Sequence, residues 1–203
     1  MNLITLQGKI ISDIVFSHEI YNEKFYRFTL SVKRKNDVED LIPIEISSFL
    51  LKDINKDDFV CIDGSIRTQN VYENERKRLY VKVFAKKITK LEQEEYINEV
   101  VLQGFSVKPC TIRSTKVGKD ICDVCLSISR AYNKTDYVPV IVWNRQATLM
   151  SNLELNTEVG IKGHLQSRYY EKKNAEGEVI EQRTVLEVSA YQVITEFNEE
   201  EEN

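Results

Sequence analysis

The sequence predicts an all-β protein made of two similar halves, and two observations support this. The first is a repeat: Leu6-Gln7-Gly8 recurs as Leu102-Gln103-Gly104, 96 residues later. The same separation relates two further pairs, the segments 28–34 (FTLSVKR) and 124–130 (VCLSISR), and Pro43 and Pro139. The second observation is that the repeated segments alternate between apolar and other residues, which is typical of β-strands. Three matches at one separation indicate an internal repeat.

Each copy is expected to contain five strands and one short helix. In the second copy, the strands are expected at residues 98–112, 119–132, 136–144, 157–171 and 179–194. Helix-forming residues replace β-branched ones over 145–153 (RQATLMSNL), which predicts a helix there, and the first copy should have its helix near 48–54. Five strands with a helix between the third and fourth are the order of an OB-fold, a small Greek-key barrel that binds oligonucleotides on one face.

The growing separation between the repeats and a short acidic stretch give the expected loop and domain boundaries. The separation between matching residues grows to 99 at Gly64 and Gly163 and to 105 at Arg78 and Arg183. The added residues fall around 172–177, where Asn and Gly favour a hairpin turn. The short acidic stretch 91–96 is expected to be a linker. We therefore expect a first OB-fold over 1–93, a second over 94–195 and an acidic tail over 196–203.

The charge of the chain is concentrated at its end. The formal net charge is −4, but the tail holds five glutamates, without which the charge becomes +1. The body is therefore near neutral, which permits a polyanionic partner on a locally basic face. The chain starts directly with strand-like sequence, and no apolar run approaches the length of a membrane span, so we expect neither a signal segment nor a membrane partner.

The sequence predicts neither a catalytic site nor a metal site. No Ser/His/Asp order, Gly-rich phosphate loop or paired carboxylate set is visible, so the chain is predicted not to be an enzyme and to need no cofactor. Cys122 and Cys125 have the spacing of half a zinc site, but on a strand they would point to opposite faces. No metal site is therefore predicted, and all four cysteines are expected to be reduced thiols.

The strand expected at 136–144 has two apolar faces. Val138, Val140 and Val142 share one face, which we expect to be core, and the other carries Tyr137, Pro139, Ile141 and Trp143. A strand of this kind is either buried on both sides or presents its second side to a flat apolar ligand. Nucleic-acid bases are such ligands, because every base has a face that stacks on aromatic rings.

Taken together, these segments resemble the bacterial single-stranded DNA-binding protein (SSB) family. The resemblance runs from Asn98 to about Val193 through NEVVLQGFSVKP, VCLSISRAY, TDYVPVIVWNRQA, EVGIKGHLQSRYY and RTVLEVSA. The first copy is similar in NLITLQGKI, FYRFTLSVKR, LIPIEI, VCIDGSIRT and LYVKVFA. Two such domains in one chain resemble the tandem OB-fold form of the family, in which a homodimer supplies four OB-folds.

The resemblance implies where bases stack. The family stacks bases on aromatic residues at a few strand positions, which here fall on Trp143, Tyr170, Tyr132 and Tyr137. Tyr132 shares its parity with core positions of its strand, so it needs a bend to face outward. Basic residues at strand ends and in loops are expected to contact phosphates, among them Arg113, Arg130, Arg145, Arg168, Lys172 and Lys173. On the fourth strand, Arg168 and Tyr170 are expected to point outward together, a cation beside a ring.

The first copy departs from this pattern. The matching positions hold Ser47, Val71, Asn36 and either Asp40 or Leu41, none of which is aromatic. The outward-facing Glu45 and Ser47 do not suit a strand of DNA. We therefore expect the first copy to contribute mainly assembly and electrostatics, and the second copy to make most of the base contacts.

The sequence thus predicts a cytoplasmic, nucleoid-associated protein that binds single-stranded DNA without sequence preference in replication, repair or recombination. The acidic tail differs from the family's usual end because no apolar residue follows it, and possible partners include replication or repair proteins. One alternative is a primosomal-type OB-fold protein that acts mainly through protein contacts in the replication machinery. Another is an assembly module in which Trp143 packs against a partner subunit.

Overall fold

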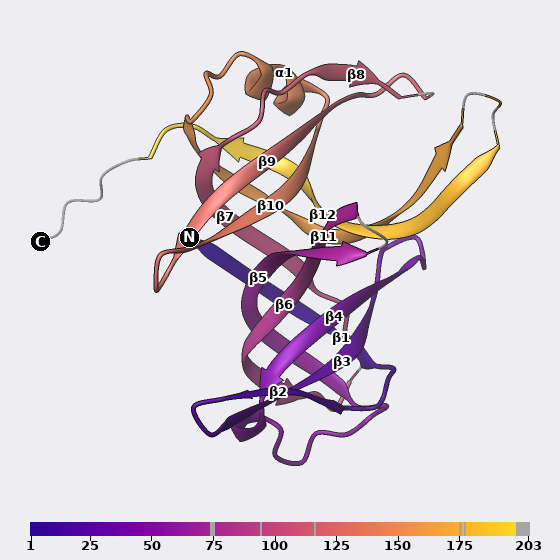
Figure 1. Ribbon diagram of the computed structural model, residues 1–203, viewed down its shortest axis with the longest axis vertical. Coiled ribbons are helices and arrows are strands. Elements are labelled where there is room, and N and C mark those ends of the chain that lie inside the picture. The colour runs from indigo at the N-terminus through magenta and orange to yellow at the C-terminus, as the bar shows by residue number, and fades with distance from the viewer. Residues whose placement is uncertain (74–75, 94, 116, 175, 177, 198–203) are drawn as a thin grey trace, which may run out of the picture. The chain divides into compact units, whose positions relative to one another are not determined.

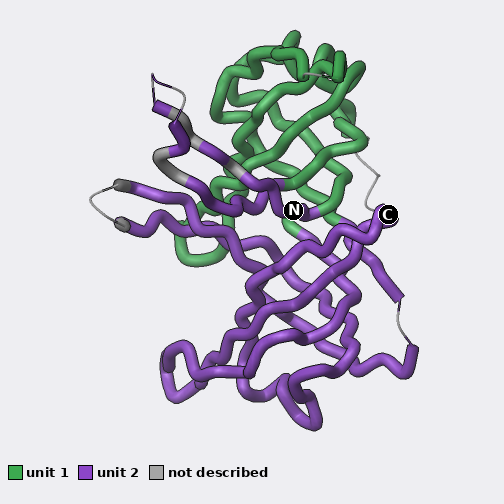
Figure 2. Tube along the Cα trace, turned by 90° about the vertical axis from the view of Figure 1, so that its right-hand side faces the viewer, with its two compact units in different colours: residues 1–2, 100–164, 188–203 green, residues 3–99, 165–187 purple. Residues whose placement is uncertain are grey.

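The computed structural model describes residues 1–73, 76–93, 95–115, 117–174, 176 and 178–197, and the side chains at 73, 76, 170, 172, 173, 180 and 181 are not described. Twelve strands are present among these residues (Figure 1). They form two compact units, coloured separately in Figure 2: unit 1 holds residues 1–2, 100–164 and 188–203, and unit 2 holds 3–99 and 165–187.

Unit 2 contains the strands of the first repeat. These are β1 (Asn2–Ile10), β2 (Val15–Ile20), β3 (Glu23–Lys33), β4 (Glu39–Ser47), β5 (Phe59–Glu73) and β6 (Arg76–Lys90). Five of them close into a barrel in which each strand pairs with the next in the order β1-β3-β4-β6-β5-β1. Only the β4–β6 pair is parallel. This is the connectivity of an OB-fold, to which β2 is added as a hairpin partner of β3.

The strands of the second repeat follow the same order. They are β7 (Asn98–Ser106), β8 (Ile112–Ser114), β9 (Asp120–Arg130), β10 (Lys134–Trp143), β11 (Glu158–Lys173) and β12 (Val179–Ile194). The barrel closes through β7-β9-β10-β12-β11-β7, again with one parallel pair, β10–β12. The long strands β11 and β12 are each divided between the two units. The part of β11 up to His164 and the part of β12 from Val188 belong to unit 1, and Leu165–Glu187 belongs to unit 2. The chain therefore contains two OB-folds in tandem, as predicted.

The core follows the predicted alternation. On β10, Val138, Val140 and Val142 are buried, and on β4 the equivalent Ile42, Ile44 and Ile46 are buried. β-Branched residues pack well on a pleated surface and cover the barrel interior in both repeats. The same sequence pattern thus produces the same core twice.

The repeat glycines have a structural reason. A Cβ atom at Gly8 would collide with the carbonyl oxygen of Ser31, and one at Gly104 with that of Ser127, which is 96 residues after Ser31. Likewise, a Cβ atom at Gly64 would meet the carbonyl oxygen of Phe84, and one at Gly163 that of Ser189. Each glycine lets two strands cross closely where the barrel bends.

Substitution of Gly104 by alanine is therefore expected to destabilise the protein by about 1–3 kcal/mol, the usual cost of overpacking. The added Cβ atom meets backbone atoms of β9, which cannot rotate away. Urea unfolding followed by circular dichroism measures the change. Gln103→Ala is the control, since it alters the neighbouring exposed hydrogen bond to Glu158 without adding a clash. Equal stabilities of the two variants would contradict this account.

Several elements differ from the sequence expectation. The helix of the second repeat is present as α1 (Arg145–Ser151), but the first repeat has only a 3₁₀ turn over Ser48–Leu50. The long strand expected at 98–112 is two strands, since β7 ends at Ser106 and β8 follows as a separate short strand. Among the described residues, no helix is both long and apolar enough to cross a membrane.

Candidate nucleic-acid interface

The outward face of β10 carries Trp143 at the carboxyl end of the strand, as predicted. Its indole is half-buried, and its Nε1 donates a hydrogen bond to Ser189 Oγ of β12 at 2.9 Å. Ile141, two residues earlier on this face, is buried, so the face is apolar around the indole. The hydrogen bond holds the ring in one orientation on the barrel surface, which favours contact with a flat ligand.

Two exposed rings lie further along this face. Tyr137 on β10 pairs with Ser127 on β9, and Ser127 pairs with Phe105 on β7. Tyr137 is 46% exposed and Phe105 is 45% exposed. A small serine thus separates two exposed rings across three neighbouring strands. Phe105 was not a predicted site residue, although its signal was present. It is an apolar residue at an exposed position of β7, in which the alternate residues Val100, Leu102, Gly104 and Ser106 are buried.

Tyr132 lies in a turn and not on a strand. The strand β9 ends at Arg130, and both Tyr132 and Asn133 have positive φ, 61° and 53°. The tyrosine ring is 92% exposed. The bend that the sequence required at this position is therefore a left-handed turn, and the ring points into solvent from it.

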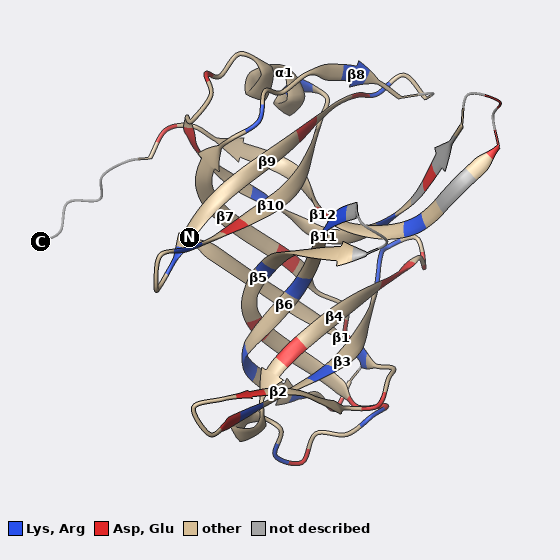
Figure 3. Ribbon diagram, in the orientation of Figure 1, with Lys and Arg blue, Asp and Glu red and all other residues tan. Residues whose placement is uncertain are grey.

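The predicted cations of unit 1 fall into two kinds. Arg145 opens α1 and is exposed, and no described residue forms an ion pair with it. Arg113 and Arg130 have acidic partners: Arg113 Nε and Nη2 donate to both oxygens of Asp123 at 3.0 and 3.2 Å, and Arg130 Nε lies 3.7 Å from Asp136. Figure 3 shows this mixture of charges along the strands. A phosphate at Arg113 or Arg130 would compete with a carboxylate already in place.

The predicted cation on β11 is also compensated. Arg168 Nε lies 3.1 Å from both carboxylate oxygens of the buried Glu187. Its pairing was not visible in the sequence, because Glu187 lies on the next strand, 19 residues away. Tyr169, the residue after Arg168, is 60% exposed. The side chains of Tyr170, Lys172 and Lys173 lie outside the described part of the structure, so the expected pairing of Arg168 with Tyr170 stays a prediction.

The base of the β11–β12 hairpin is held by an ion pair within unit 2 whose carboxylate is buried. The Asp40 carboxylate is 1% exposed and accepts hydrogen bonds from Arg34 Nε and Nη2 at 2.7 and 2.6 Å. It also accepts from the backbone N–H and the hydroxyl of Ser167 at 2.6 and 2.8 Å, while Arg34 donates to the Ser167 carbonyl at 2.7 Å. The hydrogen bond to Asp40 raises the pKa of Arg34. Ser167, the residue before Arg168, is thereby held through its backbone N–H, its hydroxyl and its carbonyl group.

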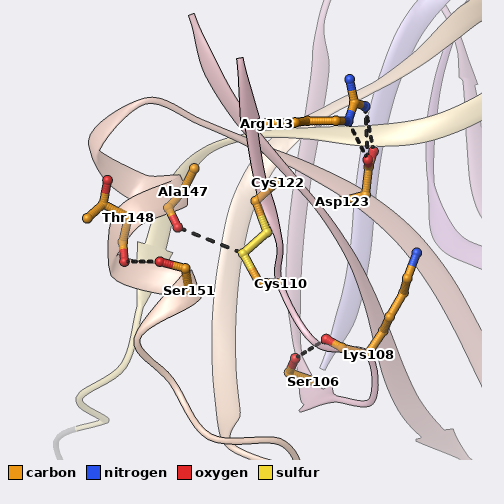
Figure 4. The surroundings of a disulfide bond; sticks show 9 residues. All are labelled: Ser106, Lys108, Cys110, Arg113, Cys122, Asp123, Ala147, Thr148 and Ser151. Carbon is orange, nitrogen blue, oxygen red and sulfur yellow. Dashed lines mark hydrogen bonds and ion pairs between the residues drawn. A yellow bond between two sulfur atoms is a disulfide. The ribbon is translucent and has the colours of Figure 1, made fainter. Parts of the chain in front are cut away.

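The cysteines differ from the expectation of four reduced thiols. Cys110 and Cys122 form a disulfide with a Cα–Cα separation of 5.6 Å, which ties the segment before β8 to β9 beside α1 (Figure 4). The sequence did not show this, because Cys110 lies in an irregular segment that only the fold brings to β9. Cys61 and Cys125 are free, and burial raises the pKa of both thiols. No group of three or more metal-ligating side chains lies within the described ranges.

Alkylation should distinguish these two kinds of cysteine. Iodoacetamide applied to the denatured, unreduced protein is expected to add two adducts, at Cys61 and Cys125, and reduction beforehand should raise the number to four. In the native protein both free thiols should react slowly at neutral pH, since the thiolate is the nucleophile and burial disfavours it. Intact mass and peptide mapping give the answer. Four adducts without reduction would contradict the disulfide.

Comparison with known proteins places this chain among single-stranded DNA-binding proteins. Residues 97–195 match the model of the single-strand binding protein family. A single-stranded DNA-binding protein of Clostridium tetani is 32% identical over 104 residues, which are 48% of this chain and 68% of that protein. Single-stranded DNA-binding protein 2 of Staphylococcus aureus is 30% identical over 87 residues, which are 39% of this chain and 62% of that protein.

Solved structures agree on the fold. The wild-type single-stranded DNA-binding protein from Thermus aquaticus superposes with a TM-score of 0.77 at 16% identity, covering 97% of this chain and 93% of that one. A deletion mutant of the same protein gives a TM-score of 0.74 at 18% identity and covers 99% of this chain and 98% of that one. With its tandem OB-folds and these relatives, the chain belongs to the single-strand binding protein family.

Proposed function

We propose that the chain binds single-stranded DNA without sequence preference and protects it during replication, repair or recombination. The observation that carries this proposal is the face of unit 1 on which Trp143 and Tyr137 of β10 and Phe105 of β7 lie, with Ser127 of β9 between the two strands. Its support is the name shared by the relatives, each a single-stranded DNA-binding protein. Family membership favours this function over the primosomal-type alternative.

Bases would stack on aromatic rings of the second repeat. Each base–aromatic stack contributes about 1–3 kcal/mol, and because every base has a π-face, the binding needs no particular sequence. Trp143, Tyr137, Tyr132 and Tyr170 are the proposed stacking residues, and Phe105 is added to them from the structure. Tyr132, in its exposed turn, would reach a base beyond the edge of the sheet.

Phosphates would lie along the basic residues. Arg145 is the strongest candidate of unit 1, because it is exposed and has no acidic partner among the described residues. Lys172 and Lys173 on β11 are proposed from the sequence. Arg113, Arg130 and Arg168 would contribute less than the sequence suggests, since each is compensated by a carboxylate.

The assembly is part of the proposal. We propose a first domain over 1–93, a main DNA-binding domain over 94–195 and an acidic tail over 196–203. A homodimer would present four OB-folds to one DNA strand and act in the cytoplasm at the nucleoid, with replication or repair proteins as partners. No enzymatic step is proposed, because binding and protection need none.

Competition between single and double strands tests the function. Fluorescence anisotropy of labelled oligothymidylate should report binding that unlabelled single strands displace and duplex of equal length does not. The logarithm of the affinity should fall linearly with that of salt, by about 0.7 for each phosphate neutralised. Displacement by duplex at the same concentration as by single strand would contradict the proposal.

A further inference from the structure

The first repeat carries aromatic rings on the outward face of its barrel, at positions that sequence matching to the second repeat does not reveal. His18 of β2 stacks on Phe25 of β3 with ring centroids 4.9 Å apart and an angle of 13° between the planes. Phe25 in turn lies 6.0 Å from Phe84 of β6. The guanidinium of Arg67 lies over the Phe84 ring at 5.9 Å. Three rings and a cation thus form a continuous row across β2, β3, β6 and β5.

This row occupies the place that Trp143 takes in the second repeat. Ile141 pairs with Ser189 in the parallel β10–β12 ladder, and Glu45 pairs with Phe84 in the parallel β4–β6 ladder, so Phe84 is the equivalent of Ser189. The crossing glycines Gly163 and Gly64 agree, since they abut the carbonyl oxygens of Ser189 and Phe84.

The equivalents of Trp143 and of its partner on β9 also differ between the repeats. Trp143 pairs with Ile121, and Ser47 pairs with Phe25. Where the second repeat has Trp, Ile and Ser, the first has Ser, Phe and Phe. In the first repeat the aromatic side chains thus lie on the two flanking strands, and the position equivalent to Trp143 holds Ser47.

Two groups on this face are open to solvent. His18 covers the buried Phe25 and its side chain is 38% exposed. Tyr80 lies on β6 with the same parity as Lys82 and Phe84, and it is 42% exposed. Partial burial and the nearby Glu45 raise the pKa of the Tyr80 phenol, while Arg27 opposes this, so both charged groups lie near the ring. A base could therefore approach His18 or Tyr80 without rearrangement of the core.

The charges of the face suit a phosphate backbone. Glu45, the residue expected to repel DNA, is only 12% exposed, and its Oε2 lies 2.6 Å from Lys82 Nζ and 3.9 Å from His18 Nδ1. Arg27 pairs with Glu45 across β3 and β4 and is exposed. Glu45 is thus neutralised by Lys82, and the exposed Arg27 lies beside this ion pair. An exposed arginine beside exposed rings matches alternating phosphates and bases better than an apolar protein surface.

We propose that this first-repeat face, made of His18, Phe25, Arg27, Tyr80, Lys82 and Phe84, is a second contact site for single-stranded DNA. Bases stack on His18 and Tyr80, and a phosphate lies at the exposed Arg27, beside the ion pair that Lys82 forms with Glu45. The inference rests on the proposed function and extends it, since the sequence alone assigned the first repeat to assembly and electrostatics.

A pair of double variants of the full chain tests the site. Tyr80→Ala with Arg27→Gln removes an exposed ring and a cation from the face. Phe16→Ala with Lys24→Gln removes an exposed ring and a cation from the opposite side of the same β2–β3 hairpin, since both residues have the other strand parity. Tyr80→Phe keeps the ring and serves as the rescue, and thermal unfolding checks that each variant folds.

Binding is measured with oligothymidylates of about 10 and about 35 nucleotides, because one OB-fold occludes about 4–16 nucleotides. The Tyr80→Ala/Arg27→Gln variant is expected to lose about 5- to 150-fold in affinity for the longer strand, as the stacking contribution implies. The Phe16→Ala/Lys24→Gln and Tyr80→Phe proteins should bind the longer strand like the wild type. Unchanged affinity in the first variant would overturn the site and leave the face to a protein partner.

Photo-cross-linking separates this inference from the proposed function. An oligonucleotide containing iodo-deoxyuridine, bound to the wild-type chain, is expected to cross-link to the peptides carrying His18 and Tyr80. Trp143 fluorescence in the same complex reports the second repeat independently. Quenched Trp143 without these cross-links would overturn the first-repeat site alone, whereas these cross-links with an unquenched Trp143 would support it and refute the stacking role of Trp143. Absence of both signals would overturn both.

Discussion

Replacement of Trp143 by alanine is expected to weaken binding of single-stranded oligothymidylate by about 5- to 150-fold, the effect of losing one base–aromatic stack. The indole is held on the barrel face by its hydrogen bond to Ser189, so its orientation is already set before DNA arrives. Loss of the ring therefore removes a prepared surface, and the rest of the face cannot replace it. Fluorescence anisotropy with a labelled oligonucleotide measures the change.

Two further variants show whether the loss comes from stacking. Trp143→Phe keeps a ring but loses the hydrogen bond to Ser189, and it should retain most of the affinity. Leu155→Ala removes an exposed apolar side chain from the loop after α1 and should change nothing. If Trp143→Ala binds as tightly as the wild type while folded, the indole does not stack on a base.

Replacement of Asp40 by alanine is expected to destabilise the protein by about 1–3 kcal/mol, the usual cost of leaving donors without their acceptor. Four hydrogen bonds converge on this carboxylate, two from Arg34 and two from Ser167. Their loss leaves the half-buried Arg34 guanidinium and the Ser167 N–H without this acceptor. Urea unfolding gives the change in free energy, and hydrogen exchange on β11 should rise next to Ser167.

An exposed ion pair provides the comparison. Asp13 accepts from Lys56 at 3.1 Å, and both side chains are largely in solvent, so Asp13→Ala should cost less than about 1 kcal/mol. Asp40→Asn keeps an acceptor for Ser167 but not the charge, and its stability should lie between those of Asp40→Ala and the wild type. An Asp40→Ala protein no less stable than Asp13→Ala would show that the pair does not hold the hairpin.

The sequence was sufficient for the parts of the fold that repeat. Gly8 and Gly104 mark the same strand crossing, and the valines of β10 and isoleucines of β4 form the same core face, so a single separation of 96 residues revealed both barrels. The short strand β8 was missed because all three of its residues are exposed and carry no alternation. The helix expected in the first repeat is only a 3₁₀ turn, although Ser47 caps it through its side chain.

The candidate site was harder to predict because strand partners are distant in sequence. The carboxylate that compensates Arg168 lies on β12, and the phenylalanine that takes the place of Trp143 in the first repeat lies on β6. Position-by-position matching along the chain follows one strand at a time. It cannot show that an aromatic side chain absent from β4 is replaced by aromatic side chains on the strands paired with β4.

The most direct test of the central proposal is a titration of tryptophan fluorescence with oligothymidylate at low and high salt. Trp143 is the only tryptophan of the chain, so the signal reports one position. Stacking of a base on the indole predicts strong quenching at low salt, and release of counterions predicts that more oligonucleotide is needed at high salt. Fluorescence that stays constant through saturation of the folded protein would contradict base stacking at Trp143.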